Sequence, residues 1–464
     1  AVYYFFIREL VKEYPDSSQA IPADAFMVYK GHEIRTTFKE FRQTPIAKGI
    51  HNHNAFKRFN NTFNYLDTTL AKKELLQEYL QKSPLHVSLH NTGIDELGLL
   101  FLLQTKELST SRNFQEIINQ ICENCHFQTR QFNGYKIFDV LKAGNPVLSF
   151  ATMEGILSVS KNPVLVEDAI RNFKKRRKNE ASPLIKAIAR SKKREKLFVN
   201  FNKLPSFVGT YTKHVTRSFL EENTLFPAYG AYDLLLQGES LQLHGNLHLT
   251  DTTPLLKHVR NLKPRKSDLP EILPLRTAFF QSFQMPDPEY YYESLINYIK
   301  AKDEYLKFKH FQDSLETSGN FSIKEDFLPV LGDEMALVIN EPVSQNFRGN
   351  TFVAMHYKEP KKKLKALKSL SDQIEKDRYS TTAPYHYRNH TIKRLPIGNA
   401  FPLIFGDFFA SIQDPFYTRL NDYILFARNK ETLSRLIDDY VDQQTLQASS
   451  HNTNLDQQLL REFN

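Results

Sequence analysis

The 464-residue chain contains no tryptophan, only two cysteines and only 16 glycines, and it lacks the short motifs that identify common reactions. There is no G-x-S-x-G, no H-E-x-x-H and no paired metal-binding cysteine motif. The scarcity of glycine also leaves no glycine-rich loop to hold a phosphate. No stretch approaches the roughly 18 consecutive apolar residues of a membrane helix. We therefore expect no catalysis, no cofactor and no bound metal.

What the chain has in quantity is phenylalanine and basic charge. There are 36 Phe and 22 Tyr, and apolar residues make up 41% of the chain and charged residues 24%, which is an ordinary globular composition. The length favours two or more folded units with Phe-rich cores. A net charge of +9 points to anionic surroundings such as lipid headgroups, acidic glycan or nucleic acid.

An internal repeat is the most informative feature. The stretch "GILSVSKNPVLVEDAIRNF" at 155–173 matches "DYILFARNKETLSRLIDDY" at 422–440 when Asn162 is aligned with Asn429. Both read as a short apolar strand, a polar turn and a helix whose apolar residues recur every three or four positions.

Further pairs of segments match in the same order along the chain. They are "IPADAFMVYKG" (21–31) with "LPLRTAFFQSF" (273–283), "SPLHVSLHN" with "DEMALVINE", "ELGLLFLLQ" with "GNTFVAMHY", "YKIFDVL" (135–141) with "HTIKRLPI" (390–397), and "GNPVLSF" (144–150) with "GNAFPLIFG" (398–406). The chain is thus predicted to be a tandem duplication with an α+β fold. Each of the two homologous halves is expected to be a mostly antiparallel sheet with helices packed on one face.

The segments "IPADAFMVYKG", "FKEFRQTPIAKGI" and "ILSVSKNPVLVEDAI" together resemble an uncharacterised family of bacterial cell-envelope proteins, a domain of unknown function. The resemblance covers roughly residues 20 to 440 and depends on apolar and turn patterns. It implies an exported protein with one membrane anchor and two similar α+β halves. It carries no catalytic residues over to this chain.

The beginning of the chain, "AVYYFFIREL", reads as the water-facing end of a membrane anchor, because aromatic residues collect at headgroups. The alternative is a processed terminus that starts an amphipathic helix. With the resemblance, the anchor reading predicts a location on the periplasmic side of a bacterial membrane, with most of the anchoring segment absent from this chain.

Five segments are predicted. Residues 1–20 are the stump of an anchor or a linker, 21–175 the first repeat, 176–265 a basic helical linker followed by a β-meander, 266–442 the second repeat and 443–464 a C-terminal tail. In the meander, "YDLLLQGESLQLHGNLHLTD", leucines alternate with other residues, which predicts strands with one buried face.

Two basic clusters flank the start of the linker. We interpret this stretch first as a solvated connecting helix, with a weak docking surface for anionic lipid or glycan as the alternative. Aromatic residues are not interleaved with these clusters, so nucleic acid is not expected as a partner. The docking residues would be Lys174, Lys175, Arg176, Arg177, Lys178, Lys192, Lys193 and Arg194.

The two cysteines lie in "QICENCHFQ", which spells C-x-x-C-H. We predict a structural disulfide between Cys122 and Cys125 at the end of a helix. Unpaired thiols, covalent haem attachment and redox catalysis are the alternatives. Haem is disfavoured because the second half builds the matching helix without cysteines, and redox catalysis because the pair lies at the wrong helix end.

Histidines and carboxylates give weaker candidates. His86 and His90, like His386 and His390, have the i, i+4 spacing of a metal pair on a helix, but on strands they would lie about 13 Å apart. The acidic pair Asp333 and Glu334 is expected to close a turn before a strand. Asp438 and Asp439 are expected to face solvent on a helix. Acid–base catalysis is the disfavoured reading of both acidic pairs.

The function predicted from the sequence is a membrane-anchored, non-catalytic envelope protein that binds another envelope component or holds an assembly in place. One alternative is a carrier of a lipid or other hydrophobic ligand in a Phe-rich cavity between the halves. A second alternative is a hydrolase with an unrecognised polar site.

Overall fold

The structure is a computed structural model. The part of the chain that it describes is 14–52, 56–57, 60–64, 83–93, 96–105, 126–142, 144–178, 182–191, 195–209, 228–237, 240–249, 267–284, 287–301, 305–319, 322–328, 331–341, 347–357, 383–395, 412 and 415–448. The chain divides into two compact units, Ala1–Thr252 and Thr253–Asn464. Each unit contains one large antiparallel sheet.

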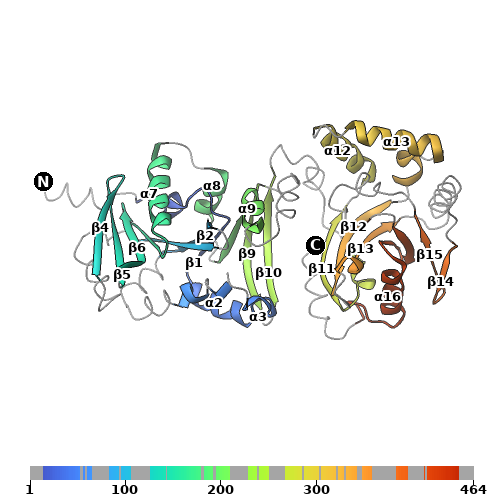
Figure 1. Ribbon diagram of the computed structural model, residues 1–464, viewed down its shortest axis with the longest axis horizontal. Coiled ribbons are helices and arrows are strands. Elements are labelled where there is room, and N and C mark those ends of the chain that lie inside the picture. Colours follow the sequence, from blue (N-terminus) through green and yellow to red (C-terminus); the bar gives the residue numbers. More distant parts are fainter. Residues whose placement is uncertain are drawn as a thin grey trace. The chain divides into compact units, whose positions relative to one another are not determined.

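The first unit is built on a 10-stranded sheet with the order β10-β9-β8-β1-β2-β3-β7-β6-β5-β4 (Figure 1). Its strands are β1 (Met27–Gly31), β2 (Leu85–Gly93), β3 (Glu96–Gln104), β4 (His126–Phe132), β5 (Tyr135–Lys142), β6 (Asn145–Met153), β7 (Ile156–Ser160), β8 (Lys196–Asn200), β9 (Tyr229–Gln237) and β10 (Ser240–His248).

Helices cover both faces of this sheet, whereas the sequence predicted helices on one face. In Figure 1, α7 (Pro163–Lys178) and α8 (Pro183–Arg190) lie on one side, and α2 (Ile34–Gln43) and α3 (Pro45–Ile50) lie on the other. A buried cluster packs the α7 side, with the 3₁₀ turn η1 (Ser17–Ala20) and apolar residues of α7 against β3, β5 and β6. A second cluster fills the opposite face. Two further short helical elements follow β8: η2 (Phe201–Lys203) and α9 (Leu204–Gly209).

The second unit has a 7-stranded sheet with the order β11-β12-β13-β17-β16-β15-β14. Its strands are β11 (Thr277–Gln284), β12 (Leu331–Asn340), β13 (Thr351–Tyr357), β14 (Tyr385–Tyr387), β15 (His390–Arg394), β16 (Phe416–Leu420) and β17 (Tyr423–Ala427). Its helical elements are η4 (Leu269–Glu271), α12 (Pro288–Ala301), α13 (Tyr305–Gly319), η5 (Ile323–Phe327), η7 (Phe347–Asn350) and α16 (Lys430–Val441).

The two sheets repeat one topology. The order β1-β2-β3-β7-β6-β5-β4 corresponds strand by strand to β11-β12-β13-β17-β16-β15-β14. In both units a pair of helices separates the first two strands along the chain. A helix also follows the seventh shared strand along the chain, α7 after β7 and α16 after β17. The predicted α+β fold with two similar antiparallel halves is therefore confirmed.

Local contacts repeat as well. The side chains of Asn162 and Asn429, aligned in the sequence, both accept backbone N–H groups at the start of their helices, from Val164 at 3.0 Å and from Thr432 at 2.8 Å. Such caps satisfy amide groups that have no partner within the helix. Both matching strand–turn–helix units therefore begin their helix with an asparagine cap, which bonds the second residue after it in the first unit and the third in the second.

The hairpin β4–β5 and its counterpart β14–β15 have the same turn geometry. Both residues of each two-residue turn have positive φ, Asn133 and Gly134 in the first unit and Arg388 and Asn389 in the second, which is the backbone that tight hairpins favour. The residue before each turn contacts the helix on that side. Arg171 lies over the ring of Phe132 at 5.6 Å, and the Tyr387 hydroxyl donates to Asp438 at 2.9 Å. The second unit replaces a cation–ring contact by a hydrogen bond.

Three predicted segment boundaries differ from the structure. The stretch 176–265 was predicted as a linker and meander, but β8 pairs with β1, and β9 and β10 continue the same sheet. Residues 17–20 of the predicted anchor stump form η1, which is buried in the first unit. In the predicted tail, Leu446 N donates to Leu273 O at 2.8 Å and the Leu446 side chain packs on the second core.

One proposed pairing of repeat segments also changes. Residues 398–406, matched in sequence to β6, lie outside the described part of the chain. The strand that occupies the β6 position in the second sheet is β16, beginning at Phe416. Apolar character alone matched the wrong stretch, because several neighbouring segments share it.

Candidate functional site

The first unit contains an apolar pocket of about 550 Å³ on the face of the sheet covered by α2. This volume is within the roughly 300–1,000 Å³ typical of ligand sites. Of its described lining side chains only Tyr29 and Thr37 carry an oxygen or nitrogen, and none of them carries a charge. The lining is Met27, Tyr29, Ile34, Thr37, Phe38, Phe41, Phe56, Phe63, Val87, Leu89, Leu97, Leu99, Leu197, Phe207, Leu234, Leu236, Leu241 and Leu243.

The pocket is elongated across the sheet. Its lining residues come from β10, β9, β8, β1, β2 and β3, which are consecutive neighbours in the sheet. At about 4.8 Å between strands, the five intervals span about 24 Å. The shape is therefore a trough that crosses the strands, with aromatic side chains of α2 along one wall.

The hairpin β9–β10 forms one end of this trough. Leu234 pairs with Leu243, and Leu236 with Leu241, so that all four side chains point to the same face. The sequence predicted this face to be buried, but Leu243 keeps 43% of its surface exposed. The sequence identified the alternation of leucines in β9 and β10 correctly. These leucines face a partly open pocket and not a closed core.

Helix α2 is held over the trough by a carboxylate from outside the helix. Its N-cap residue Glu33 makes no capping hydrogen bond with its own side chain. Instead Glu195 accepts from the backbone N–H groups of His32 at 3.1 Å and Glu33 at 3.2 Å, and from the hydroxyl of Tyr29. A carboxylate at a helix N-terminus is favoured by the helix dipole.

Gly31 makes room for this contact. A Cβ atom at position 31 would overlap a carboxylate oxygen of Glu195 and the phenol of Tyr29. Burial and the hydrogen bond to Glu195 raise the pKa of Tyr29, so that the phenol stays protonated and donates. The position of α2 along the trough thus depends on Gly31 at the end of β1.

The opposite face of the first sheet carries a buried polar cluster. His86 and Ser17 are fully buried, and Ser17 Oγ lies 2.9 Å from His86 Nδ1. Next to them, Lys30 donates to the backbone carbonyls of Ile188 at 2.8 Å and Ser191 at 2.9 Å, at the end of α8. A serine beside a histidine is a hydrolase pattern. Here neither side chain reaches the surface, so the cluster ties η1 and α8 to the sheet.

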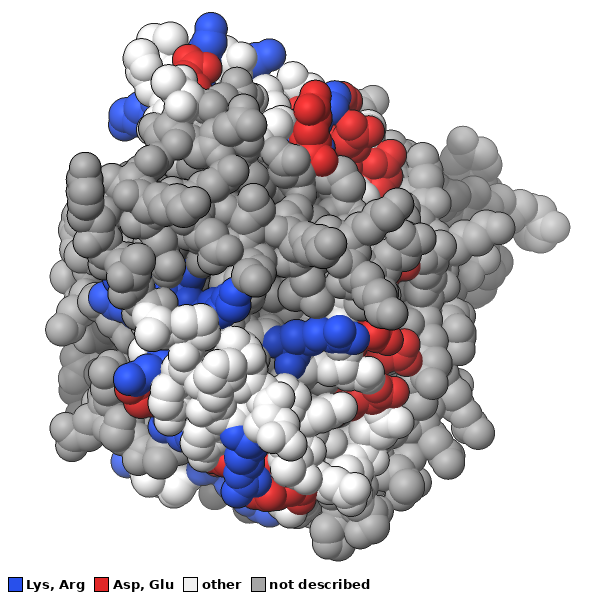
Figure 2. Space-filling view, turned by 90° about the vertical axis from the view of Figure 1, so that its right-hand side faces the viewer, with Lys and Arg blue, Asp and Glu red and all other residues white. Residues whose placement is uncertain are grey.

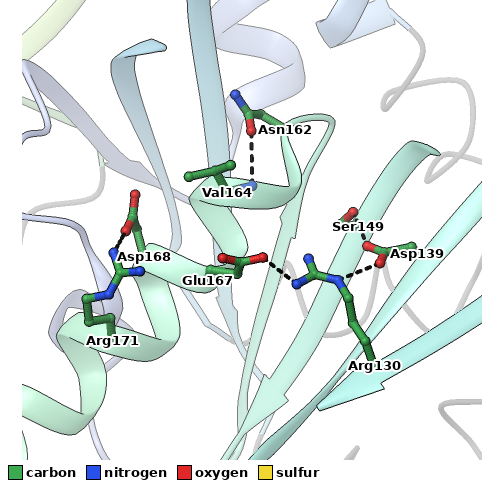
Figure 3. A network of polar contacts seen from close by, with 8 residues as sticks. All are labelled: Arg130, Asp139, Ser149, Asn162, Val164, Glu167, Asp168 and Arg171. Carbon is green, nitrogen blue, oxygen red and sulfur yellow. Dashed lines mark hydrogen bonds and ion pairs between the residues drawn. The ribbon is translucent and has the colours of Figure 1, made fainter. Parts of the chain in front are cut away.

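Arg130 connects the β4 end of the sheet to α7 (Figure 3). Its Nε donates to Asp139 at 2.7 Å and its Nη1 pairs with Glu167 on the helix. Ser149 donates to the other oxygen of Asp139 at 2.5 Å. Arg130, Asp139, Glu167 and Ser149 bond to one another on the α7 side of the sheet, which is the face opposite the trough, and this indicates a structural role.

In the second unit, Asp333 and Glu334 lie inside β12 and not in a turn before it, as the sequence predicted. The β12–β13 register shifts between Leu331 and Met335, and this irregularity lets neighbouring carboxylates reach separate partners. Asp333 lies 2.8 Å from His356 Nδ1. Glu334 is buried and accepts from Tyr423, whose pKa is raised by burial and by this carboxylate.

The histidine pairs have different outcomes. His86 and His90 lie on one strand with separate partners, His90 lying 3.2 Å from Asp24 and 2.8 Å from Ser88 Oγ, as the strand reading predicted. His386 and His390 instead lie on the two strands of the hairpin β14–β15. Among the described residues, no three His, Cys, Asp or Glu side chains are placed to hold a metal ion.

Most predicted docking residues are at the end of α7. Lys174 and Lys175 are exposed there, while Arg176 donates to the carbonyls of Ser18 at 3.1 Å and Gln19 at 2.9 Å. Arg176 therefore fastens η1 to the helix. The positions 177 and 178 fall on α7 without described side chains, and Lys192, Lys193 and Arg194 lie outside the described residues.

The predicted disulfide and the predicted anchor remain predictions. Cys122 and Cys125 fall within 106–125, and the aromatic run at the beginning of the chain within 1–13, all outside the described residues. Within the described part of the chain, no helix is long and apolar enough to cross a membrane.

The remaining carboxylate pair on α16 is engaged in ion pairs. Asp439 accepts from Arg276 at 2.8 Å, and Asp438 pairs with Arg388 at 2.9 Å. Burial raises the pKa of Asp439, while Arg276 opposes that shift. These partners indicate that the pair connects α16 to neighbouring segments of the second unit.

Sequence reasoning did not assemble the trough, although two signals for it were present. The leucine alternation of β9–β10 was recognised, and Phe38 and Phe41 in "FKEFRQTPIAKGI" have helical spacing. Their meeting on one face of the sheet depends on β8 joining β1, which no local pattern shows.

Comparisons with known proteins do not show which family the chain belongs to. No protein-family model matches the chain, and neither a curated protein nor a solved structure was found to be similar. The resemblance to a cell-envelope family thus stays a prediction.

Proposed function

We propose that this chain is a non-catalytic binding protein whose first unit holds one acyl chain of a lipid. The observation that carries the proposal is the trough of about 550 Å³, whose described lining residues include no charged side chain. Burying apolar ligand surface there would contribute roughly 25 cal/mol per Å². The carrier alternative from the sequence placed its cavity between the halves, whereas this trough lies within the first unit.

The length of the trough favours an acyl chain over a compact ring. A membrane leaflet is about 15 Å thick in its hydrocarbon part, since the whole core is about 30 Å. The trough spans about 24 Å across six strands, long enough for an extended chain. Leu243 and Leu247, exposed at 43% and 52% on β10, would let the ligand enter from that edge.

The hydrolase alternative has less support. The Ser17–His86 contact is fully buried, and Arg130, Asp139 and Glu167 neutralise one another. A role as an anchored scaffold on the periplasmic side, bound to another envelope protein, stays a prediction. It is compatible with lipid binding but does not follow from it.

The absence of tryptophan gives a direct test. Leu241→Trp would place the only indole of the chain in the trough, and Leu235→Trp would place it on the opposite face of the same hairpin. After removal of copurified lipid, we expect palmitate to shift the emission of the first variant to shorter wavelength and saturably. Octanoate should act at much higher concentration because it buries less apolar area.

A second pair of variants tests the site by affinity. Leu234→Asp would place a charge in the trough and should weaken palmitate binding at least tenfold, since an unpaired charge resists removal from water. Leu235→Asp, on the exposed face, should leave it unchanged. The proposal is wrong if palmitate does not bind the lipid-free protein, or if the two aspartate variants lose affinity equally.

A further inference from the structure

A second concave site, of about 420 Å³, lies on the sheet of the second unit over β15, β16 and β17. We call it the cationic groove. Its floor includes the buried side chains of Tyr417 and Ile424. The other lining residues are polar or basic: Asn389, His390, Thr391, Lys393, Thr418, Arg419 and Asn421.

The strand register places the side chains of Lys393 and Arg419 on the same face of the sheet. Lys393 pairs with Tyr417 across β15 and β16, and Arg419 pairs with Ile424 across β16 and β17. Because side chains alternate between faces, Tyr417 and Arg419 share a face two residues apart, and Lys393 shares it through its pairing with Tyr417. Two positive side chains therefore border one groove.

The presence of basic side chains alone does not identify an anion site on this protein. On the side of the molecule drawn in Figure 2, basic and acidic side chains of the described residues lie close to one another. An anion site has to be recognised by cations without a carboxylate partner. Neither Lys393 nor Arg419 forms an ion pair with any carboxylate of the described residues.

The guanidinium of Arg419 is also fixed in place. Its Nε donates to the backbone carbonyl of Asn421 at 3.0 Å, and the group lies 5.0 Å over the ring of Tyr357. No described residue accepts from its Nη groups, so these remain for a ligand. A guanidinium that is already oriented loses little freedom when it binds an anion.

The described residues at the equivalent position of the first unit differ in character. There Phe138 follows the buried Ile137 and stacks on Phe150 at 5.2 Å, whereas Lys393 follows the buried Ile392 and pairs with Tyr417. The second unit thus has the half-buried ammonium group of Lys393 where the first unit has the ring of Phe138, which packs against an apolar core cluster.

We propose that the cationic groove binds the anionic group of a small hydroxylated ligand, either a carboxylate or a phosphate monoester. Lys393 and Arg419 would bind the anion. Thr391 and Asn389 would offer hydrogen bonds to neighbouring hydroxyl groups. This site is independent of the acyl-chain trough, since it lies in the other unit.

The test uses the whole chain and three ligands with one scaffold: glucose 6-phosphate, glucuronate and glucose, measured by ligand-observed NMR. We expect at least one anion to bind with a dissociation constant of about 10 mM or tighter and glucose not to bind. Binding should weaken with added salt. Glucose 6-phosphate binding alone would assign a phosphate ligand, and glucuronate binding alone a carboxylate ligand.

The double variant Lys393→Gln with Arg419→Gln should weaken anion binding at least tenfold. Arg394→Gln is the matched control, because Arg394 is the next residue on β15, faces the other side of the sheet and does not line the groove. Unchanged thermal unfolding would show that the variants are folded. Failure of both anions to bind, equal binding of glucose, or equal loss in the Arg394→Gln variant would overturn the proposal.

Discussion

His86 shows how burial decides the chemistry of a single residue. Burial lowers the pKa of this histidine to about 4 from 6.5, with Asp16 opposing the shift and Lys30 adding to it. The folded chain therefore holds a neutral imidazole on a strand that has Ala336 at the matching position of the second half. His86, whose i, i+4 spacing from His90 is that of a metal-binding pair on a helix, is instead a buried core residue.

The pH dependence of stability follows from this shift. Above pH 6.5 His86 is neutral in both states and contributes no pH dependence. Between pH 6.5 and 4 the unfolded chain binds a proton that the folded chain refuses, so the free energy of unfolding falls with decreasing pH, by about 3 kcal/mol at most.

His86→Gln keeps a polar side chain beside Ser17 without a titrating group. Denaturant unfolding at pH 8, 6 and 4.5 should show a smaller loss of stability for the variant than for the wild type. Identical pH profiles for the two proteins would contradict the assignment.

At the scale of elements, Arg130 is the residue whose ion pairs join the β4–β5 hairpin to α7 (Figure 3), beside the ring contact of Arg171 with Phe132. Its partner Asp139 keeps only 10% of its side chain exposed. Removing the guanidinium would leave that carboxylate nearly buried with Ser149 as its remaining partner in this network. A charge left without its counter-ion in such a place is destabilising.

We expect Arg130→Met to lower the free energy of unfolding by about 2 kcal/mol. Arg171→Met is the matched control, because Arg171 is 56% exposed and pairs with Asp168 one turn away, and a methionine can still pack on the ring of Phe132. It should change stability by about 0.5 kcal/mol or less. Denaturant unfolding of the two variants measures both values, and equal losses would show that Arg130 has no special role.

Elements were predicted best where the chain repeats itself. The alignment of Asn162 with Asn429 identified two equivalent strand–turn–helix units, since capping and helix periodicity are local properties. The turn between His386 and His390 was missed, because Arg388 and Asn389 adopt the left-handed conformation without glycine. Asp333 and Glu334 were placed in a turn because Gly332 and two acids resemble one, whereas they belong to an irregular strand.

At the scale of the whole molecule, the duplication has produced two units with different surfaces. One topology carries an apolar trough in the first unit and a cationic groove in the second. The first unit also extends its sheet by β8, β9 and β10, and these strands supply the end of the trough.

If each unit is a folded body, residues 1–252 and 253–464 should each be expressed as a soluble fragment. Each should unfold cooperatively, as followed by circular dichroism. The Leu241→Trp response to palmitate should be retained in the first fragment. A first fragment that folds but does not respond would place the ligand elsewhere, and unfolded fragments would show that the units depend on each other.

The sequence by itself determined the duplication, the α+β class and the paired strand–turn–helix units, because periodicity, caps and the matching of segments are properties of neighbouring residues. It also determined which residues of β9 and β10 share a face. Only the tertiary structure decided what that face meets. Leu234 and Phe38 line one trough because β8 joins β1 and Glu195 fixes α2, contacts between residues far apart in the chain that no local pattern records.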